Sequence, residues 1–435
     1  MRQAAQVRSP LDLAADALTV LMALVLFGMS AMTLSALGIA YDQAGGSFLQ
    51  KFHPATYLAC LALAVRFVAS ANPLGWLVQQ TERFPGATYF VTTWVVMIVF
   101  ASMVQQAPIS PIIDSFLCSI AFLVLYADAD DRTRTTLRLA LHAFMLVNAC
   151  IGYFEFVSHM RLTPYVTGGK IILHDYRSTA LLGHPLVNSG AGAAYALMLI
   201  YGADRSVNWF LRLVLVAVQL GALVTFGGRT AIVLCAILGA IRLLKPALEV
   251  LGGGRFDMRI ALLAALSAPV GIAAVVYLMQ RGTFDGLIER FADDKGSSSA
   301  RVVIFQLFDY FSFDELLFGP DQQRLATIQN TLGIEYGIES SWFGFIFGYG
   351  AFMTFFFMIA FAALMWEYWR RSRPGASALF LYILIQLSSA AGISVKTPMF
   401  NQFVILLLVF FCDWPHARRP QGASRRSYGL SPERA

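Results

Sequence analysis

The stretch VNWFLRLVLVAVQLGALVTFGGRTAIVLCAILGAIRLL, residues 207–244, decides the class of fold. It contains two apolar runs, 207–226 and 229–244, of the kind that crosses the roughly 30 Å hydrocarbon core of a bilayer as helices. Between them stands FGGRTA, in which Arg229 follows two glycines. A charge at such a position is costly unless it faces protein, water or an anion. The stretch therefore predicts two membrane helices that meet at a boundary where Arg229 has a specific partner.

The whole chain repeats this pattern of apolar runs. Of its 435 residues, 57% are hydrophobic and only 13% are charged, which excludes a soluble protein with a solvated shell. The runs lack the strict alternation of an outer-membrane barrel. We therefore predict an all-α integral membrane protein with about twelve transmembrane helices. They are expected near residues 16–40, 54–71, 88–104, 110–127, 138–157, 180–203, 207–226, 229–244, 260–279, 341–366, 376–393 and 398–412.

Basic residues predict the orientation of these helices, because cytoplasmic loops are enriched in Lys and Arg. With both termini inside, 21 of the 32 basic residues fall on the cytoplasmic side, although the largest loop lies outside. The first span has no small-residue cleavage site after it and is interpreted as retained. The net charge of +6 then reports orientation and not nucleic-acid binding. We interpret residues 1–412 as a polytopic membrane domain and residues 413–435 as a disordered basic cytoplasmic tail.

Two segments on the predicted outer side are too long to be turns. One covers residues 158–190, and the other, residues 280–340, lies between the ninth and tenth predicted spans. In the second segment SARVVIFQLFDYF places Val302, Phe305, Leu307, Phe308 and Phe311 roughly on one helical face. We expect a helix at the membrane surface within a large periplasmic loop. Its simplest role is interfacial, with the preceding arginine reaching the lipid headgroups.

Four short motifs follow one another between residues 177 and 350. They supply Gly183, Pro185 and Asn188 in GHPLVNSG, Arg229 in FGGRTA, Arg301 with Phe305 and later Leu317, Phe318 and Gly319, and Glu339 with Ser340 in ESSWF. In this order they resemble the O-antigen ligase and Wzy-type polysaccharide polymerase superfamily, including its VpsF-like polysaccharide biosynthesis branch. The last motif departs from the family, because Glu339 and Ser340 stand where a His-Asn pair is usual.

The resemblance implies a metal-independent membrane glycosyltransferase of the GT-C-like polymerase and ligase type, without a cofactor. Its donor would be an oligosaccharide on undecaprenyl diphosphate, and its site would face the periplasm in the bacterial inner membrane. Arg229 and Arg301 would bind the diphosphate, since fixed guanidinium groups hold phosphate bidentately. Glu339 becomes the candidate general base. Alternatively, Glu339 only interacts with the positive end of the following helix.

Other polar residues near these motifs are candidate substrate contacts, each with a structural alternative. Arg177 could instead anchor the chain in the headgroups, and His184 could cap a helix. The predicted substrate-binding residues are Arg177, His184, Asn188, Ser340, Asp321 and Tyr336. Glu155, near the outer end of the fifth span, is either functional or paired with Arg161 in a structural ion pair.

Several patterns that would indicate other chemistry are missing or have simpler readings. The five cysteines form no CxxC pair, the six histidines show no zinc-ligand spacing, and no nucleotide-binding glycine motif occurs. The DAD at residues 128–130 is interpreted as a solvated charge cluster and not as a metal-binding motif. We therefore predict no metal and no cofactor.

The missing His-Asn pair favours a polymerase, whose acceptor is a second lipid-linked glycan. An O-antigen ligase, which transfers glycan to a lipid A core or a protein, remains an alternative. A polysaccharide or lipid transporter or flippase is an alternative of another class, although we see no clear repeat between the two halves of the sequence. A fourth reading is a non-catalytic subunit that organises polysaccharide assembly and export proteins.

Overall fold

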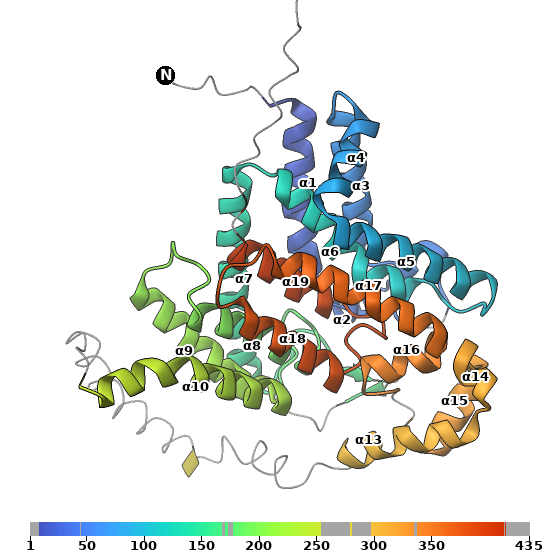
Figure 1. Ribbon diagram of the computed structural model, residues 1–435. Helices are drawn as coiled ribbons and strands as arrows, with labels where there is room; N and C mark the ends of the chain where they lie inside the picture. The colour runs from blue at the N-terminus through green and yellow to red at the C-terminus, as the bar shows by residue number, and fades with distance from the viewer. Residues whose placement is uncertain are drawn as a thin grey trace, which may run out of the picture.

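The computed structural model describes residues 8–43, 45–167, 170–172, 177–253, 279–280, 297–334, 337–412 and 414. Within them the chain is almost entirely helical, and its one sheet is a hairpin of two short antiparallel strands (Figure 1). Nearly all of the predicted span 260–279, most of the loop before residue 297 and the tail after residue 414 lie outside these residues.

The described residues of the first half form seven α-helices, a short 3-10 helix and the hairpin. These are α1 (Pro10–Gly28), α2 (Ala31–Ala36), η1 (Phe48–Lys51), α3 (Pro54–Ala69), α4 (Pro73–Arg83), α5 (Pro85–Met103), α6 (Ser110–Asp128), α7 (Asp131–Ser158), β1 (Val166–Thr167) and β2 (Lys170–Ile171). Proline is the first residue of α1, α3, α4 and α5. At this position its missing N–H removes no helical hydrogen bond, so proline fixes where each helix begins.

The second half contains the remaining described helices. These are α8 (Pro185–Ile200), α9 (Trp209–Phe226), α10 (Arg229–Leu251), α13 (Ser297–Gln306), η2 (Leu307–Tyr310), α14 (Phe313–Phe318), α15 (Gln322–Thr331), α16 (Ser341–Tyr349), α17 (Ala351–Trp369), α18 (Ala376–Ser389) and α19 (Met399–Phe411). We call the end of the bundle at the start of α7 the inner end and the end where α7 finishes the outer end, following the predicted orientation. Figure 1 shows α4 and the start of α1 at one side of the molecule and α13–α15 at the opposite side.

Length and composition identify the helices that could cross a membrane. Six described helices qualify, namely α1, α5, α6, α7, α9 and α17, and α3 with α4 would make a seventh, bent by 118°. The apolar helices α8, α18 and α19 are shorter. The prediction of an all-α, multi-pass membrane protein is thus confirmed in its coarse form, whereas about twelve spans and a periplasmic loop remain predictions.

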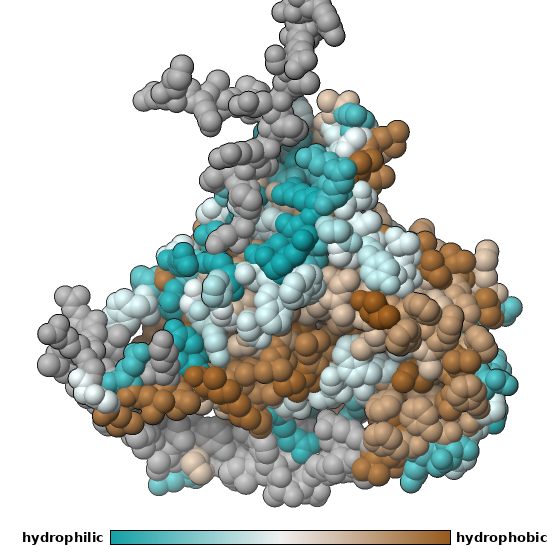
Figure 2. All heavy atoms as spheres, in the orientation of Figure 1, coloured by the Kyte–Doolittle hydropathy of each residue, from teal (hydrophilic) through white to brown (hydrophobic). Residues whose placement is uncertain are grey.

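Exposed apolar side chains mark surfaces that suit a lipid environment. On α10, Val233, Ile237, Ile241, Leu244 and Leu248 are all exposed. Their spacing of three or four residues places them along one stripe of the helix. Figure 2 shows apolar side chains gathered over α10, whereas polar ones gather between α1 and α4 at the inner end. The hydropathy of the surface therefore agrees with a membrane-embedded bundle.

The predicted span 341–366 is wrong as a single helix, because the chain reverses at Gly350. The rings of Phe345 in α16 and Phe357 in α17 stack with centroids 4.4 Å apart. In one straight helix these two positions would be about 18 Å apart along the axis. Gly350 has φ of +83°, and a Cβ there would lie 2.5 Å from the Leu317 carbonyl oxygen. Only glycine fits this turn, so α16 is a short helix that folds back along α17.

Buried ion pairs hold the inner end together. Asp128 accepts from Arg83 Nη1 at 2.7 Å and from Trp76 Nε1 at 3.1 Å, and Arg66 pairs with Asp12 at 2.7 Å. The Asp128 side chain is only 13% exposed. The expectation of a solvated charge cluster at residues 128–130 is therefore wrong for Asp128, which joins a network linking α1, α3, α4 and α6. Breaking one partner of such a network leaves a buried charge uncompensated, so its role is structural.

Candidate functional site

The glycines before Arg229 shape the junction between α9 and α10. Gly227 ends α9 with φ of +65°, and its N–H donates to the Leu223 carbonyl, a common helix ending. The Gly228 N–H donates to Ser189 Oγ at 2.9 Å, and a Cβ on Gly228 would lie 2.4 Å from Ser189 Cβ. The first glycine thus permits the turn and the second permits close contact with α8. Arg229, partly exposed, is the first residue of α10 and lies beside the first turns of α8.

The loop that carries Arg177 is fastened to the same junction. The Ser178 N–H donates to the Thr225 carbonyl at 3.1 Å, and Ser178 Oγ donates to the Gly152 carbonyl at 2.7 Å. Thr225 lies two residues before Gly227. The structure therefore brings the segment with Arg177 and the segment with Arg229 together at the outer end of α7 and α9.

Glu155 anchors this loop through backbone hydrogen bonds. Its carboxylate, 3% exposed, accepts from the N–H groups of Leu162, Thr179 and Ala180, each at 2.8 Å. The predicted ion pair with Arg161 is wrong, because Arg161 donates instead to the Ile172 carbonyl at 2.6 Å. The physical reason is that loop N–H groups buried near the membrane need an acceptor, and a carboxylate can accept several at once.

Tyr165 was not predicted as a site residue, but its side chain contacts two residues that were, Arg177 and His184. The guanidinium carbons of Arg161 and Arg177 lie 5.5 Å and 5.8 Å from the centre of its ring, and Arg177 Nη2 donates to its hydroxyl at 3.4 Å. His184 Nε2 is 3.5 Å from the same hydroxyl. Arg177 and His184 are therefore neighbours. Tyr165 itself is buried, so it orients the cation and the imidazole from beneath.

His184 also fulfils its structural alternative as the N-cap of α8. Its Nδ1 accepts from the Leu186 N–H at 3.2 Å. Because Nδ1 is the acceptor, Nε2 bears the hydrogen in the neutral ring and points toward the Tyr165 hydroxyl. Capping fixes both the position and the tautomer of the ring. His184 could therefore offer a donor of defined direction at the mouth of α8.

Asn188 is placed inside the protein and supports the site from behind. It is fully buried, and its amide nitrogen donates to the carbonyls of Thr179 at 2.5 Å and His184 at 3.0 Å. Its oxygen accepts from Asn148 at 2.9 Å. Both amide hydrogens are thus used within the protein. The predicted substrate contact is not what this geometry offers, and the role of Asn188 is to hold the loop and the helix start in register.

The helices of the long loop pack on the short helix α16. Phe305 and Phe308 contact Phe343 and Phe347, with ring centroids 5.3 Å and 4.9 Å apart in the pairs Phe305–Phe343 and Phe308–Phe347. Arg301 lies on α13 one turn before Phe305, although its side chain is outside the described residues. Glu339 and Ser340 stand one turn before Phe343. The helix of Arg301 and the start of α16 are therefore brought against each other.

The expected single apolar face of 302–311 is split into two. Leu307 and Phe311 are buried in the loop's own small core, whereas Val302 and Phe305 are 64% and 59% exposed. The reason is the change from α13 to the 3-10 helix η2 at Leu307, which alters the angular spacing of successive side chains. The exposed pair can still face lipid.

The remaining predicted residues of this loop either have structural roles within it or lie outside the described residues. Asp321 caps α15 by accepting from the Arg324 N–H at 2.8 Å. Ser340 is the N-cap residue of α16 but makes no capping hydrogen bond through its side chain, and it is buried. Glu339 beside it is exposed. Tyr336 lies outside the described residues, so its predicted contact stays a prediction.

A continuous path of contacts links α16 with α8. Ser341 Oγ donates to the Ala390 carbonyl at 2.8 Å in the segment between α18 and α19. At the other end of that segment, a Cβ on Gly190 would lie 3.6 Å from Met399 Sδ. Gly190 follows Ser189, the partner of the α9–α10 junction. The first turns of α8, α10 and α19 and the short helix α16 therefore all lie in the outer half of the bundle.

A buried polar cluster nearby was not predicted from the sequence. Asp114 accepts from the His53 N–H at 3.1 Å and from Thr56 Oγ1 at 2.7 Å, and Lys396 Nζ lies 3.8 Å from the centre of the Tyr41 ring. Burial lowers the pKa of Lys396. The only sequence signal was an isolated lysine in the apolar stretch AAGISVKTPMF. Its partners are more than 280 residues away in the chain, which a single sequence does not reveal.

Comparisons with known proteins add no relative: no protein-family model, no curated protein and no solved structure matches this chain.

Proposed function

We propose that this protein is a polysaccharide polymerase of the membrane. It would transfer a glycan from an undecaprenyl-diphosphate donor to the hydroxyl of a second lipid-linked glycan, at the periplasmic face of a bacterial inner membrane. The proposal is supported chiefly by the position of Arg229, which a double glycine sets at a helix junction beside the segment of Arg177 and His184. Export and assembly proteins for the polymer are the partners we expect.

The proposed glycan transfer requires a fixed positive charge and a group that accepts a proton. When the bond between the sugar carbon and the phosphate oxygen breaks, the diphosphate keeps the electron pair, and its negative charge grows. Guanidinium groups held by the fold stabilise that charge without a metal. Arg229 and Arg301 fill this role, with Arg177 beside the glycan or the second phosphate.

The acceptor hydroxyl forms the new glycosidic bond as it loses its proton. Glu339, exposed at the start of α16, is the group we assign to take that proton. Glu339 directly precedes Ser340, the N-cap residue of α16, and its exposed carboxylate is open to a substrate. This gives Glu339 the access to substrate that the His-Asn pair has in the resembling family.

Reconstitution tests the proposal directly. The purified full chain in proteoliposomes receives a synthetic lipid-linked repeat unit, with and without chelator, and the chain length of the product is measured by gel electrophoresis and mass spectrometry. We expect chain growth under both conditions. Transfer to added lipid A core in place of chain growth would identify the ligase alternative.

Arginine variants give the sharper measurement. Arg229→Ala and Arg301→Ala should each slow chain growth on the order of 100-fold, as removal of one transition-state donor typically does. Arg229→Lys should recover only part of the rate, because an ammonium group cannot bind bidentately. Arg324→Ala is the matched control, since Arg324 is a loop arginine already paired with Glu315. Wild-type growth in Arg229→Ala, with normal abundance in the membrane, would overturn the assignment.

One observation favours a second candidate, a transporter or flippase for lipid-linked glycans. The fold-back of α16 on α17 is an interrupted helix of the kind that forms substrate sites in transporters. The same proteoliposomes separate the two functions. Movement of the lipid-linked unit between leaflets without chain growth would support transport and contradict polymerisation.

A further inference from the structure

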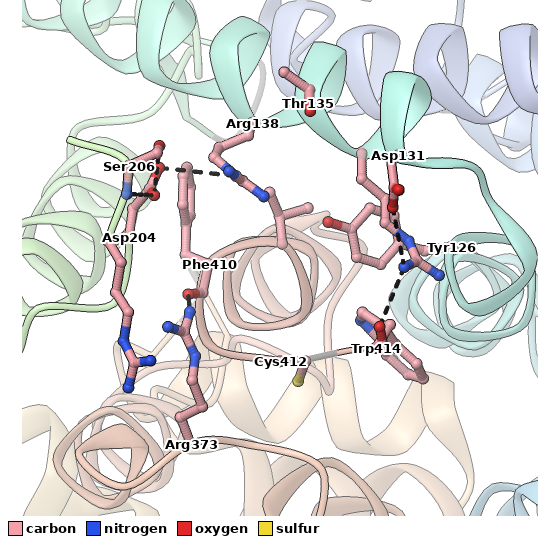
Figure 3. A pocket seen from close by; sticks show the side chains of 13 residues that line it. Tyr126, Asp131, Thr135, Arg138, Asp204, Ser206, Arg373, Phe410, Cys412 and Trp414 are labelled. Atoms are coloured by element: carbon pink, nitrogen blue, oxygen red, sulfur yellow. Dashed lines mark hydrogen bonds and ion pairs between the residues drawn. The ribbon is translucent and has the colours of Figure 1, made fainter. Parts of the chain in front are cut away.

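A basic pocket lies at the inner end of the bundle, opposite the proposed catalytic end. Its volume is about 380 Å³, and its charged lining consists of Arg134, Arg138, Arg205, Arg373, Asp131 and Asp204. Figure 3 shows Arg138 reaching in from α7 and Arg373 from the turn after α17. The pocket belongs to the first turns of α7, and Glu155 near the far end of the same helix anchors the outer loop. At 1.5 Å per residue the two sites are about 26–36 Å apart along the axis of α7, counted to Glu155 from Arg138 and from Asp131.

Asp204 neutralises this pocket only in part, because its carboxylate pairs with Arg138 and is also bound by His142 and Ser206. The carboxylate accepts from the Ser206 N–H at 2.8 Å, from Ser206 Oγ at 2.7 Å and from His142 Nε2 at 2.9 Å. Arg138 Nε lies farther away, at 3.8 Å. Burial alone would raise the pKa of Asp204, but the hydrogen bonds from His142 and Ser206 outweigh it and hold the pKa at about 2. Arg138 therefore retains donors for a ligand.

Two further arginines have unused donors. Arg134 is 8% exposed, and its Nη atoms donate to the carbonyls of Trp414 and Ala127 at 3.3 Å and 3.0 Å, whereas its buried Nε has no hydrogen-bond partner. Arg205 makes no hydrogen bond or ion pair within the described part of the chain. Arg205 is exposed, so only the Arg134 Nε is a buried donor, and unsatisfied buried donors are uncommon in proteins and point to a missing acceptor.

The charge of the pocket, its volume and the direction of α7 all favour an anionic ligand. Four guanidinium groups face two carboxylates, and one of these, Asp131, has a side chain 70% exposed. The pocket also lies at the N-terminal turns of α7, where the helix dipole favours anions. A cavity of this size admits a phosphate group together with a modest organic part. A carboxylate ligand would use fewer of the donors.

We propose that this pocket binds a phosphate-bearing molecule at the cytoplasmic face, independently of the glycan chemistry proposed for the outer end. The phosphate belongs either to an acidic phospholipid headgroup or to a soluble phosphate compound. Arg138 and Arg205 bind it from the open side, and the Arg134 Nε–H approaches it from within.

Two arms of one experiment test the proposal and separate the two sources. In the first, the full chain in phosphatidylcholine nanodiscs is titrated with inorganic pyrophosphate by calorimetry. In the second, nanodiscs contain phosphatidylcholine with or without phosphatidylglycerol, and native mass spectrometry detects retained phosphatidylglycerol. We expect binding in at least one arm. Arg205→Gln and Arg138→Gln should each weaken that binding about tenfold, as loss of a charge-assisted contact does.

Arg132→Gln is the matched control, because Arg132 is exposed on the same first turn of α7 but does not line the pocket. It should leave binding unchanged. No binding of pyrophosphate and no retention of phosphatidylglycerol would overturn the proposal. Equal weakening by Arg132→Gln and Arg205→Gln would also overturn it, since the attraction would then be diffuse. Among the described residues Arg205 has no hydrogen-bond or ion-pair partner, so its variant keeps the test independent of folding.

Discussion

Replacing Glu155 with glutamine tests how the outer site is held. The substitution keeps the size of the side chain and removes its charge. In the structure one carboxylate oxygen accepts from the Leu162 N–H, and the other accepts from the N–H groups of Thr179 and Ala180. A glutamine can offer its oxygen to only one of these two positions. Its best orientation keeps the two donors of Thr179 and Ala180 and turns an amide N–H₂ toward the Leu162 N–H.

The expected loss follows from this count. One hydrogen bond to a charged group disappears, and two become neutral. Hydrogen bonds to charged groups contribute roughly 1.5–3 kcal/mol and neutral ones about 1 kcal/mol. We therefore expect the free energy of opening the loop to fall by at least about 3 kcal/mol, which corresponds to a roughly 100-fold or larger increase in the equilibrium constant for opening.

Hydrogen exchange of the purified full chain measures this opening. Peptides that contain Leu162, Thr179 and Ala180 should lose protection in Glu155→Gln, whereas peptides from the centre of α7 should not. Arg161→Gln is the control, because Arg161 bonds to Ile172 and not to Glu155. It should leave the amides of Thr179 and Ala180 protected. Unchanged protection in Glu155→Gln, or the same loss in both variants, would refute the anchoring role.

Two further predictions concern packing and pH. Gly228→Ala should destabilise the protein by roughly 1–3 kcal/mol through overpacking, because its Cβ would meet Ser189 Cβ at 2.4 Å, and an unchanged midpoint in thermal melting would contradict this close contact. Asp204→Asn should lower the free energy of unfolding at pH 7 by about 2 kcal/mol, since the depressed pKa of about 2 makes the charged form stabilising above pH 4. The difference between wild type and Asp204→Asn should shrink as the pH falls from 4 to 2, and a constant difference in detergent-driven unfolding would contradict this account.

The fold could be predicted from the sequence wherever the end of an apolar run coincides with the end of a helix. The glycine pair at residues 227 and 228 marked such an end, and α9 agrees closely with the predicted run 207–226, whereas α10 begins at the predicted Arg229 but extends seven residues beyond the predicted end, to Leu251. Gly350 could not be recognised in this way, because the residues on both sides of it are equally apolar. Whether a glycine in such a run makes a turn depends on what packs against it, here the backbone of Leu317 to Gly319.

The site was predictable where a charge interrupts an apolar context and not where a partner is distant. Arg229 stands out from its neighbours in the sequence, and the structure places it beside Arg177 and His184 through their segments. Tyr165 carries no such signal, because aromatic residues are common in loops, and only the fold gives it two arginines and a histidine. Glu155 was recognised as unusual in the sequence. Its hydrogen-bond partners are backbone N–H groups, so the types of the neighbouring residues do not reveal them.

The ends of the helices explain why polar side chains gather in this part of the molecule. Inside a bilayer every backbone N–H and C=O must be satisfied within the protein, and a helix satisfies all of its own groups except those at its ends. A site for a charged substrate is therefore most easily built where several helices end together, provided that buried side chains accept or donate the remaining hydrogen bonds. Ser189 does this for Gly228, and Glu155 does it for the loop of Arg177. Changes at these supporting residues should appear first as lost stability, whereas changes at Arg229 should appear as lost activity in a stable protein.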